Sequence, residues 1–122
     1  MRFESVRVSY IISTKNRAMF LAEALRNVRD FITPADELII VDGASTHDTA
    51  KVVEANRDIV KMFVSEPDCG EAHDFNKGIL ASRGEYFKPL TDDDHIYAEN
   101  MEYAVQVMEA HPELYALQCG GG

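Results

Sequence analysis

The segment Leu38-Ile39-Ile40-Val41-Asp42-Gly43 places four aliphatic residues in a row before an acid and a glycine. An unbroken apolar run of this length is typical of a strand that is buried on both faces, as the strands of parallel sheets are. The Asp-Gly pair is a turn signal, so the strand is expected to end there. The segment therefore predicts a buried strand over residues 37–41.

Strand-like and helix-like patterns alternate on both sides of this segment. Strands are expected over residues 6–14, 37–41, 59–64 and 85–90, with a fifth opening at 114–119. Helices are expected over residues 17–31, 45–56, 72–83 and 101–111. Because repeated βα units with short connections build parallel sheets covered on both faces, the pattern predicts an α/β fold with a doubly wound, mostly parallel sheet.

Local signals also indicate where helices end and which faces they bury. Ser45 or Thr46 is expected to cap the second helix, and Gly84 to stop the third. The apolar stripe of the third helix is expected to consist of Ala72, Phe75, Ile79 and Leu80.

The whole chain, residues 1–122, is expected to form a single domain. Because three glycines directly follow the fifth strand, we expect this domain to be incomplete at its C-terminus, truncated after about five strands. An interrupted sheet would expose apolar surface, so self-association through the truncated edge is also expected.

The composition limits the partners of the chain. Its 122 residues carry a formal net charge of −9, which disfavours nucleic acid and anionic membrane surfaces. Cys69 and Cys119 form no zinc or disulfide pattern, as suits a reducing cytosol. No apolar run is long enough to span a bilayer, so a cytoplasmic location is expected, and any membrane association would come from a longer parent protein.

The polar residues that could bind a ligand or take part in catalysis fall in four loops, each of which follows one of the four expected strands. These loops cover residues 13–17, 42–46, 66–70 and 91–95. In a parallel sheet they meet at one edge, where open α/β sheets bind ligands. The last loop reads Thr91-Asp92-Asp93-Asp94-His95, and clustered carboxylates at such an edge favour a hard divalent cation. His95 is expected to be solvated, and Cys69 has no base partner that would make it a nucleophile.

Five stretches in order resemble the N-terminal, nucleotide-binding half of a family 2 glycosyltransferase with the GT-A, Rossmann-like fold. They are residues 11–17, 39–49, 65–70, 74–78, and 84–86 followed by Leu90-Thr91-Asp92-Asp93-Asp94. The resemblance covers nearly the whole chain. It implies an enzyme that transfers a sugar from a UDP-linked nucleotide-sugar with inversion at the anomeric carbon. The acceptor would be a glycan, a lipid or a protein, and the sequence does not identify which.

The resemblance also implies roles for particular residues. Contacts with the nucleotide-sugar are expected from Ser13, Thr14, Lys15, Arg17, Asp42, Asp74, Lys77, Asp92 and Asp93. Within this set, Asp42 would accept the imide N–H of uracil, whereas Lys15 departs from the aromatic residue often found at its position. Mn²⁺ or Mg²⁺ would be bound by Asp92 and Asp94 of the DxD-like cluster and would bridge the diphosphate. The general base would lie beyond Gly122, so no catalytic residue is expected within the chain.

Two other functions remain open at this stage. The same fold could serve as a non-catalytic nucleotide-sugar-binding module. A nucleotidyltransferase-like domain is the third reading, but it would be expected to carry a glycine-rich basic loop after the first strand, and residues 13–17 contain no glycine.

Overall fold

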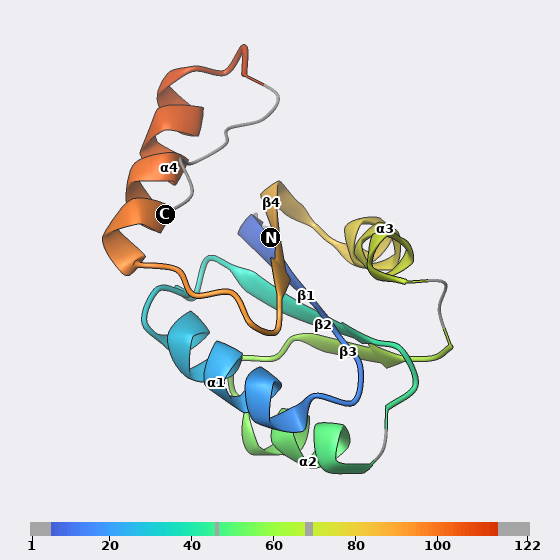
Figure 1. Cartoon of the computed structure of the whole chain (residues 1–122). Coiled ribbons are helices and arrows are strands. Elements are labelled where there is room, and N and C mark those ends of the chain that lie inside the picture. The colour runs from blue at the N-terminus through green and yellow to red at the C-terminus, as the bar shows by residue number, and fades with distance from the viewer. Residues whose placement is uncertain (1–5, 46, 68–69, 115–122) are drawn as a thin grey trace, which may run out of the picture.

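The computed structural model describes residues 6–45, 47–67 and 70–114. Their elements are, in order, β1 (Val6–Thr14), α1 (Ala18–Arg29), β2 (Glu37–Asp42), α2 (His47–Ala55), β3 (Met62–Ser65), α3 (Glu71–Ala81), β4 (Gly84–Thr91) and α4 (Ala98–Ala110). The strands form one parallel sheet in the order β3-β2-β1-β4 (Figure 1). The expectation of an α/β fold with a parallel sheet is therefore confirmed, whereas residues 115–119 of the expected fifth strand lie outside the described residues.

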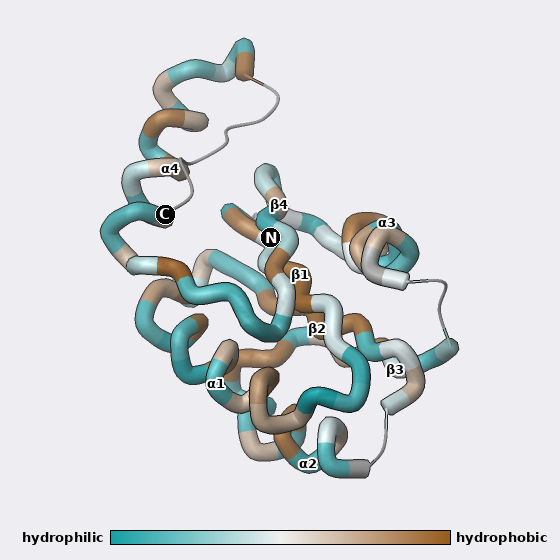
Figure 2. Tube along the Cα trace, in the orientation of Figure 1, coloured by the Kyte–Doolittle hydropathy of each residue, from teal (hydrophilic) through white to brown (hydrophobic). Residues whose placement is uncertain are grey.

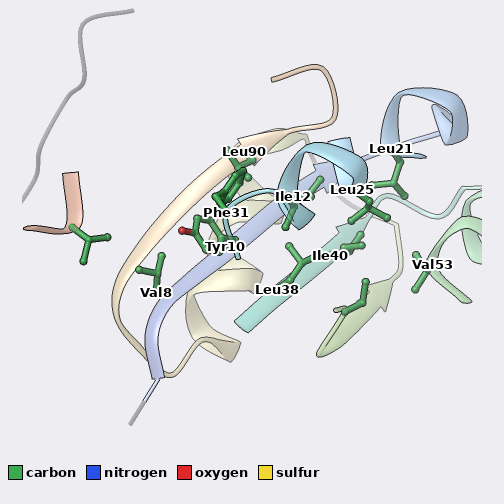
Figure 3. Close-up of a cluster of buried hydrophobic side chains, with 13 residues drawn as sticks. Val8, Tyr10, Ile12, Leu21, Leu25, Phe31, Leu38, Ile40, Val53 and Leu90 are labelled. Carbon is green, nitrogen blue, oxygen red and sulfur yellow. The ribbon is translucent and has the colours of Figure 1, made fainter. Parts of the chain in front are cut away.

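Helices cover both faces of the sheet. Alternate residues of β1 point to opposite sides, so each face presents apolar side chains that a helix can bury. Tyr10 and Ile12 belong to a large apolar cluster that also contains residues of α1, α2 and α4 (Figure 3). Ile11, between them, belongs to a smaller cluster beneath α3. In Figure 1, α1 and α2 lie below the sheet and α3 lies on its other side. The two central strands are thus buried on both faces, as the apolar run 38–41 predicts.

The hydropathy of the chain follows this arrangement. The trace of β1 and β2 is mostly brown in Figure 2, and the loops around the sheet are mostly teal. All six residues of β2 are buried. The strands β3 and β4 lie at the two edges of the described sheet, and nearly all of their residues are exposed or only partly buried. The core is therefore centred on β1 and β2, and the strand ends carry the polar residues.

The third strand begins later than the sequence pattern predicts. Residues 59–61 precede β3, which starts at Met62. The carbonyl oxygen of Asn56 accepts hydrogen bonds from the amides of Ile59 (3.0 Å) and Val60 (3.1 Å), which holds both residues in a turn after α2. Val60 is nevertheless buried in the core. Its apolar character thus reflects burial in a turn rather than in a strand.

The predicted stripe of α3 is wrong at Ala72, which is exposed, and at Leu80, which is 88% exposed. The residues of α3 that pack on the sheet are Phe75, Ile79 and Ala81. Gly78 sets this orientation, because a Cβ atom there would lie 2.3 Å from Cγ2 of Ile11. The absence of a side chain at Gly78 lets the helix approach β1 closely and turns Leu80 to solvent.

The prediction that Gly84 stops α3 is also wrong. The helix ends at Ala81, and Gly84 is the first residue of β4. Its amide donates a 2.8 Å hydrogen bond to the hydroxyl of Ser9. A Cβ atom at Gly84 would lie 2.6 Å from that hydroxyl oxygen, so the glycine allows β4 to start close against β1.

Among the described helices, none is both long and apolar enough to cross a membrane.

The close approach at Gly78 predicts a measurable loss of stability. Gly78→Ala should lower the free energy of unfolding by about 1–2 kcal/mol, because overpacking against the fully buried Ile11 outweighs the better helix propensity of alanine. Urea unfolding would measure the change. Asn76→Ala, at an exposed position of the same helix, is the control and should lie within about 0.5 kcal/mol of the parent. An unchanged or more stable Gly78→Ala variant would contradict this packing.

Candidate functional site

The carboxyl ends of the four strands bring polar residues into one row. Thr14 of β1 is in register with Asp42 of β2, which is in register with Ser65 of β3. On the other side of β1, Ser13 is in register with Thr91 of β4. Because all four strands are parallel, the loops that follow them meet at this edge, as the sequence predicts.

Two neighbouring residues at the end of β1 bind two buried carboxylates on opposite sides of the sheet. The Ser13 hydroxyl donates a 2.7 Å hydrogen bond to Asp74 of α3. The Thr14 hydroxyl donates a 2.9 Å hydrogen bond to Asp92, which follows β4. Asp74 and Asp92 are only 3% and 4% exposed. Burying a carboxylate is costly unless it accepts hydrogen bonds. The hydroxyls at the end of β1 therefore stabilise both acids and fix their positions.

A third buried carboxylate, Asp42, holds the loop that follows β2. It accepts hydrogen bonds from the Ser45 amide (2.9 Å), from the Ser45 hydroxyl and from the Ser65 hydroxyl (2.7 Å). The Ser45 hydroxyl, expected to cap α2, thus donates to Asp42, and the alternative cap Thr46 lies outside the described residues. The amide of Asn16 donates to the Ser45 hydroxyl at 2.6 Å. The loops after β1 and β2 are therefore joined through Asp42.

Arg17 supplies the positive charge beside the acidic loop. Its guanidinium lies 3.1 Å from Asp92 and 3.7 Å from Asp93, and it stacks 4.2 Å from the ring centroid of Phe20. Burial raises the pKa of Asp92, against the opposing effects of the Thr14 hydrogen bond and the Arg17 charge. The Thr91 hydroxyl bond lowers the pKa of the exposed Asp93. Neighbouring carboxylates in this loop therefore have different environments.

Asp94 closes a tight turn with Thr91. One of its oxygens accepts a 2.8 Å hydrogen bond from the Thr91 amide, and its own amide donates to the Thr91 carbonyl at 3.3 Å. The residue is exposed. Among residues 6–45, 47–67 and 70–114, no group of three or more His, Cys, Asp or Glu side chains could hold a metal ion by itself. A divalent cation at Asp94 would therefore need further oxygen ligands from a substrate, as Mg²⁺ commonly does with phosphates.

The two lysines of the predicted site have different surroundings. Lys15 is exposed in the loop after β1. The Lys77 ammonium pairs with Glu66 at 2.8 Å and contacts the Pro67 carbonyl at 3.4 Å, which ties α3 to the loop after β3. This contact lowers the pKa of Glu66. Lys77 thus supports the third loop in this structure, although it shares a helix with Asp74.

Sequence reasoning missed the hydroxyl partners of these acids. Ser65 and Thr91 were not candidates, yet they bind Asp42 and Asp93 respectively. A recognisable signal is a Ser or Thr at the last position of a strand, where its side chain lies beside the neighbouring strand end. Such residues are also common in turns, so the signal is weak when taken alone.

The sequence and the fold were compared with known proteins. The poly(ribitol-phosphate) beta-N-acetylglucosaminyltransferase TarS of Staphylococcus aureus is 26% identical over 111 residues, which are 87% of this chain and 19% of TarS. An uncharacterized glycosyltransferase of Rickettsia conorii is 33% identical over 104 residues, 83% of this chain and 17% of that protein. The chain thus spans less than a fifth of the length of these relatives.

Solved structures support the same fold. The mannosyltransferase PcManGT of Pyrobaculum calidifontis, in complex with GDP-Man and Mn²⁺, matches with a TM-score of 0.74 at 27% identity, over 85% of this chain and 32% of that one. S. aureus TarS in complex with UDP-GlcNAc matches with a TM-score of 0.79 at 23% identity, over 88% of this chain and 32% of that one. The model of the family "Glycosyl transferase family 2" matches residues 9–120, and the chain therefore belongs to this family.

Proposed function

We propose that this chain binds the nucleotide-sugar donor, UDP-linked, of an inverting glycosyltransferase. The observation that carries the proposal is the meeting, at one sheet edge, of three buried carboxylates with an exposed acidic turn. The family membership and the relatives support transfer chemistry. Two solved relatives hold GDP-Man with Mn²⁺ and UDP-GlcNAc, which supports a nucleotide-sugar as ligand.

In this proposal the ends of β1 and β2 bind the nucleoside. Asp42 accepts the imide N–H of uracil through a remaining lone pair, since each of its oxygens already accepts a hydrogen bond from Ser45 or Ser65. Asp74 is directed by Ser13 and would contact ribose or base. The exposed Lys15 covers the base with its aliphatic stem or reaches the diphosphate.

The acidic loop is the proposed place of the divalent cation, Mn²⁺ or Mg²⁺. Asp94 fits the role of a protein ligand because it is exposed and oriented by the Thr91 amide. Asp92 would be a second ligand only after changing partners, since its two oxygens lie against Thr14 and Arg17. A bound cation would act as a Lewis acid that stabilises the leaving nucleoside diphosphate. Asp93 is then left to contact the ribose.

The charge of the chain makes local compensation necessary. With a net charge of −9, the protein as a whole repels a diphosphate. Arg17, and Lys77 if it leaves Glu66, would supply positive charge at the sheet edge. The general base that inverting transfer needs is proposed to lie outside these residues, together with the surface for a glycan, lipid or protein acceptor.

The proposed function predicts that binding depends on a metal ion. UDP should bind this chain with Mg²⁺ or Mn²⁺ present and at least about tenfold more weakly with a chelator, because the diphosphate otherwise faces Asp92, Asp93 and Asp94. Titration calorimetry measures both affinities. Equal affinity with and without metal would remove the proposed role of the acidic loop, and no binding under either condition would contradict the donor-binding function.

A further prediction separates the roles of two carboxylates. Asp94→Asn should bring the UDP affinity with Mg²⁺ down to the chelator value, because it weakens the exposed metal ligand. Asp42→Asn should weaken the binding of UDP by about 1–3 kcal/mol both with Mg²⁺ and with chelator, because the contact with the base is lost while the metal ligand is kept.

Glu54→Gln, which changes the net charge equally at an exposed position of α2, is the control and should bind UDP as the parent does. Titration calorimetry on the three variants gives the comparison. If Asp42→Asn bound UDP normally, Asp42 would serve only the turn at Ser45. If Asp94→Asn kept the full metal effect, another group would be the ligand.

A further inference from the structure

Asn27 is a polar residue on the buried side of α1. Its helix neighbours Leu21, Leu25 and Val28 are fully or almost fully buried in the core, and Asn27 itself is only 8% exposed. A buried carboxamide in such a place is costly unless both its donor and its acceptor are used. The side chain therefore needs a partner that explains its position.

The partner is the backbone of Ile96. The side-chain Nδ2 of Asn27 donates to the Ile96 carbonyl at 2.7 Å, and the Ile96 backbone amide donates to the side-chain Oδ1 of Asn27 at 2.7 Å. This two-point contact links α1 to a residue 69 positions later in the chain. Ile96 also packs with its side chain against the main core. The chain between β4 and α4 is thus fixed at one defined point.

That point lies directly after the acidic loop. On the near side, Thr91 pairs with β1 and Asp92 is held by Thr14. On the far side, Ile96 is held by Asn27. Only residues 93–95 lie between the two fixed points, and these are exposed. A loop that is fixed at both ends loses less conformational entropy when its carboxylates bind a ligand.

We infer that Asn27 is a positioning residue that preorganises the acidic loop for the metal–diphosphate group. The inference rests on the proposed function, because that function supplies the ligand. Asn27 itself does not touch the ligand. It acts by keeping the backbone of Ile96 in place, so that Asp94 is presented to the cation at the turn formed with Thr91.

The test compares the metal coupling of UDP binding in variants of Asn27. The coupling is the ratio of the UDP dissociation constant in chelator to that in saturating Mg²⁺, measured by titration calorimetry. In Asn27→Ala the ratio should fall about fivefold, because the loop must be ordered when the cation binds, while affinity in chelator stays near the parent value. Asn27→Asp keeps the acceptor for the Ile96 amide and should lose less of the ratio.

Asn56→Ala is the matched control. The Asn56 side chain also donates to a backbone carbonyl, that of Val52 at 2.8 Å, but it does so at the end of α2. Its loss should lower stability without changing the metal coupling. If Asn27→Ala proves unfolded, Asn27→Asp and Asn27→Ser carry the test.

The outcomes separate this inference from the proposed function. If the parent chain shows no metal-dependent UDP binding, the proposed function fails. If the parent shows it, and folded Asn27 variants keep the full coupling or lose no more than Asn56→Ala, the positioning role of Asn27 is wrong. A fall in coupling that is specific to Asn27 and smaller in Asn27→Asp supports the inference.

Discussion

The hydrogen bonds at the end of β1 are the interactions on which the candidate site depends. Ser13 and Thr14 point to opposite faces of the sheet, and each hydroxyl binds a carboxylate that is almost fully buried. A buried polar group without a hydrogen-bond partner carries a desolvation penalty of about 1–3 kcal/mol, and more when it is charged. The two hydroxyls offset part of this penalty for Asp74 and Asp92. The central strand therefore fixes the position of α3 on one side and of the loop after β4 on the other.

Packing away from the edge makes these contacts possible. Gly78, one helical turn after Asp74, lets α3 lie close to Ile11. The Asp74 carboxylate is thereby brought within hydrogen-bond distance of Ser13. Gly84 lets β4 begin close to Ser9, which sets the register that brings Thr91 beside Ser13. The apolar layers thus determine the geometry of a polar edge that itself contributes little to the core. The acids at that edge are then oriented before any ligand arrives, which is how preorganised sites bind charge.

The sequence predicted those features that depend on local pattern. The apolar run at 38–41 identified a strand buried on both faces, and the alternation of elements identified a parallel sheet with its polar loops at one edge. It failed where packing decides the outcome. Leu80 reads as part of an apolar stripe, but Gly78 turns it to solvent, and Ile59 and Val60 read as a strand although Asn56 holds them in a turn.

Contacts between distant segments were also outside the reach of the sequence pattern. The partners Thr14–Asp92 and Asn27–Ile96 join residues 78 and 69 positions apart, and no periodicity reveals such pairs. The site residues were therefore predicted as a set, on the basis of strand ends and family resemblance, whereas their individual partners required the structure. The same distinction applies to Lys77, which was predicted to contact the nucleotide-sugar and whose partner in the structure is Glu66.

The proposed binding surface for a nucleoside diphosphate and its cation is the carboxyl edge of the sheet. The most direct measurement is the mapping of backbone amide chemical shifts during titration of the ¹⁵N-labelled chain with UDP and Mg²⁺. The largest changes are expected in residues 13–17, 42–45 and 91–96. A groove lined by Glu37, Lys61 and Arg83 near the opposite ends of the strands should show little change. Changes centred on that groove, or no changes at saturating UDP, would show that the carboxyl edge is not the binding surface.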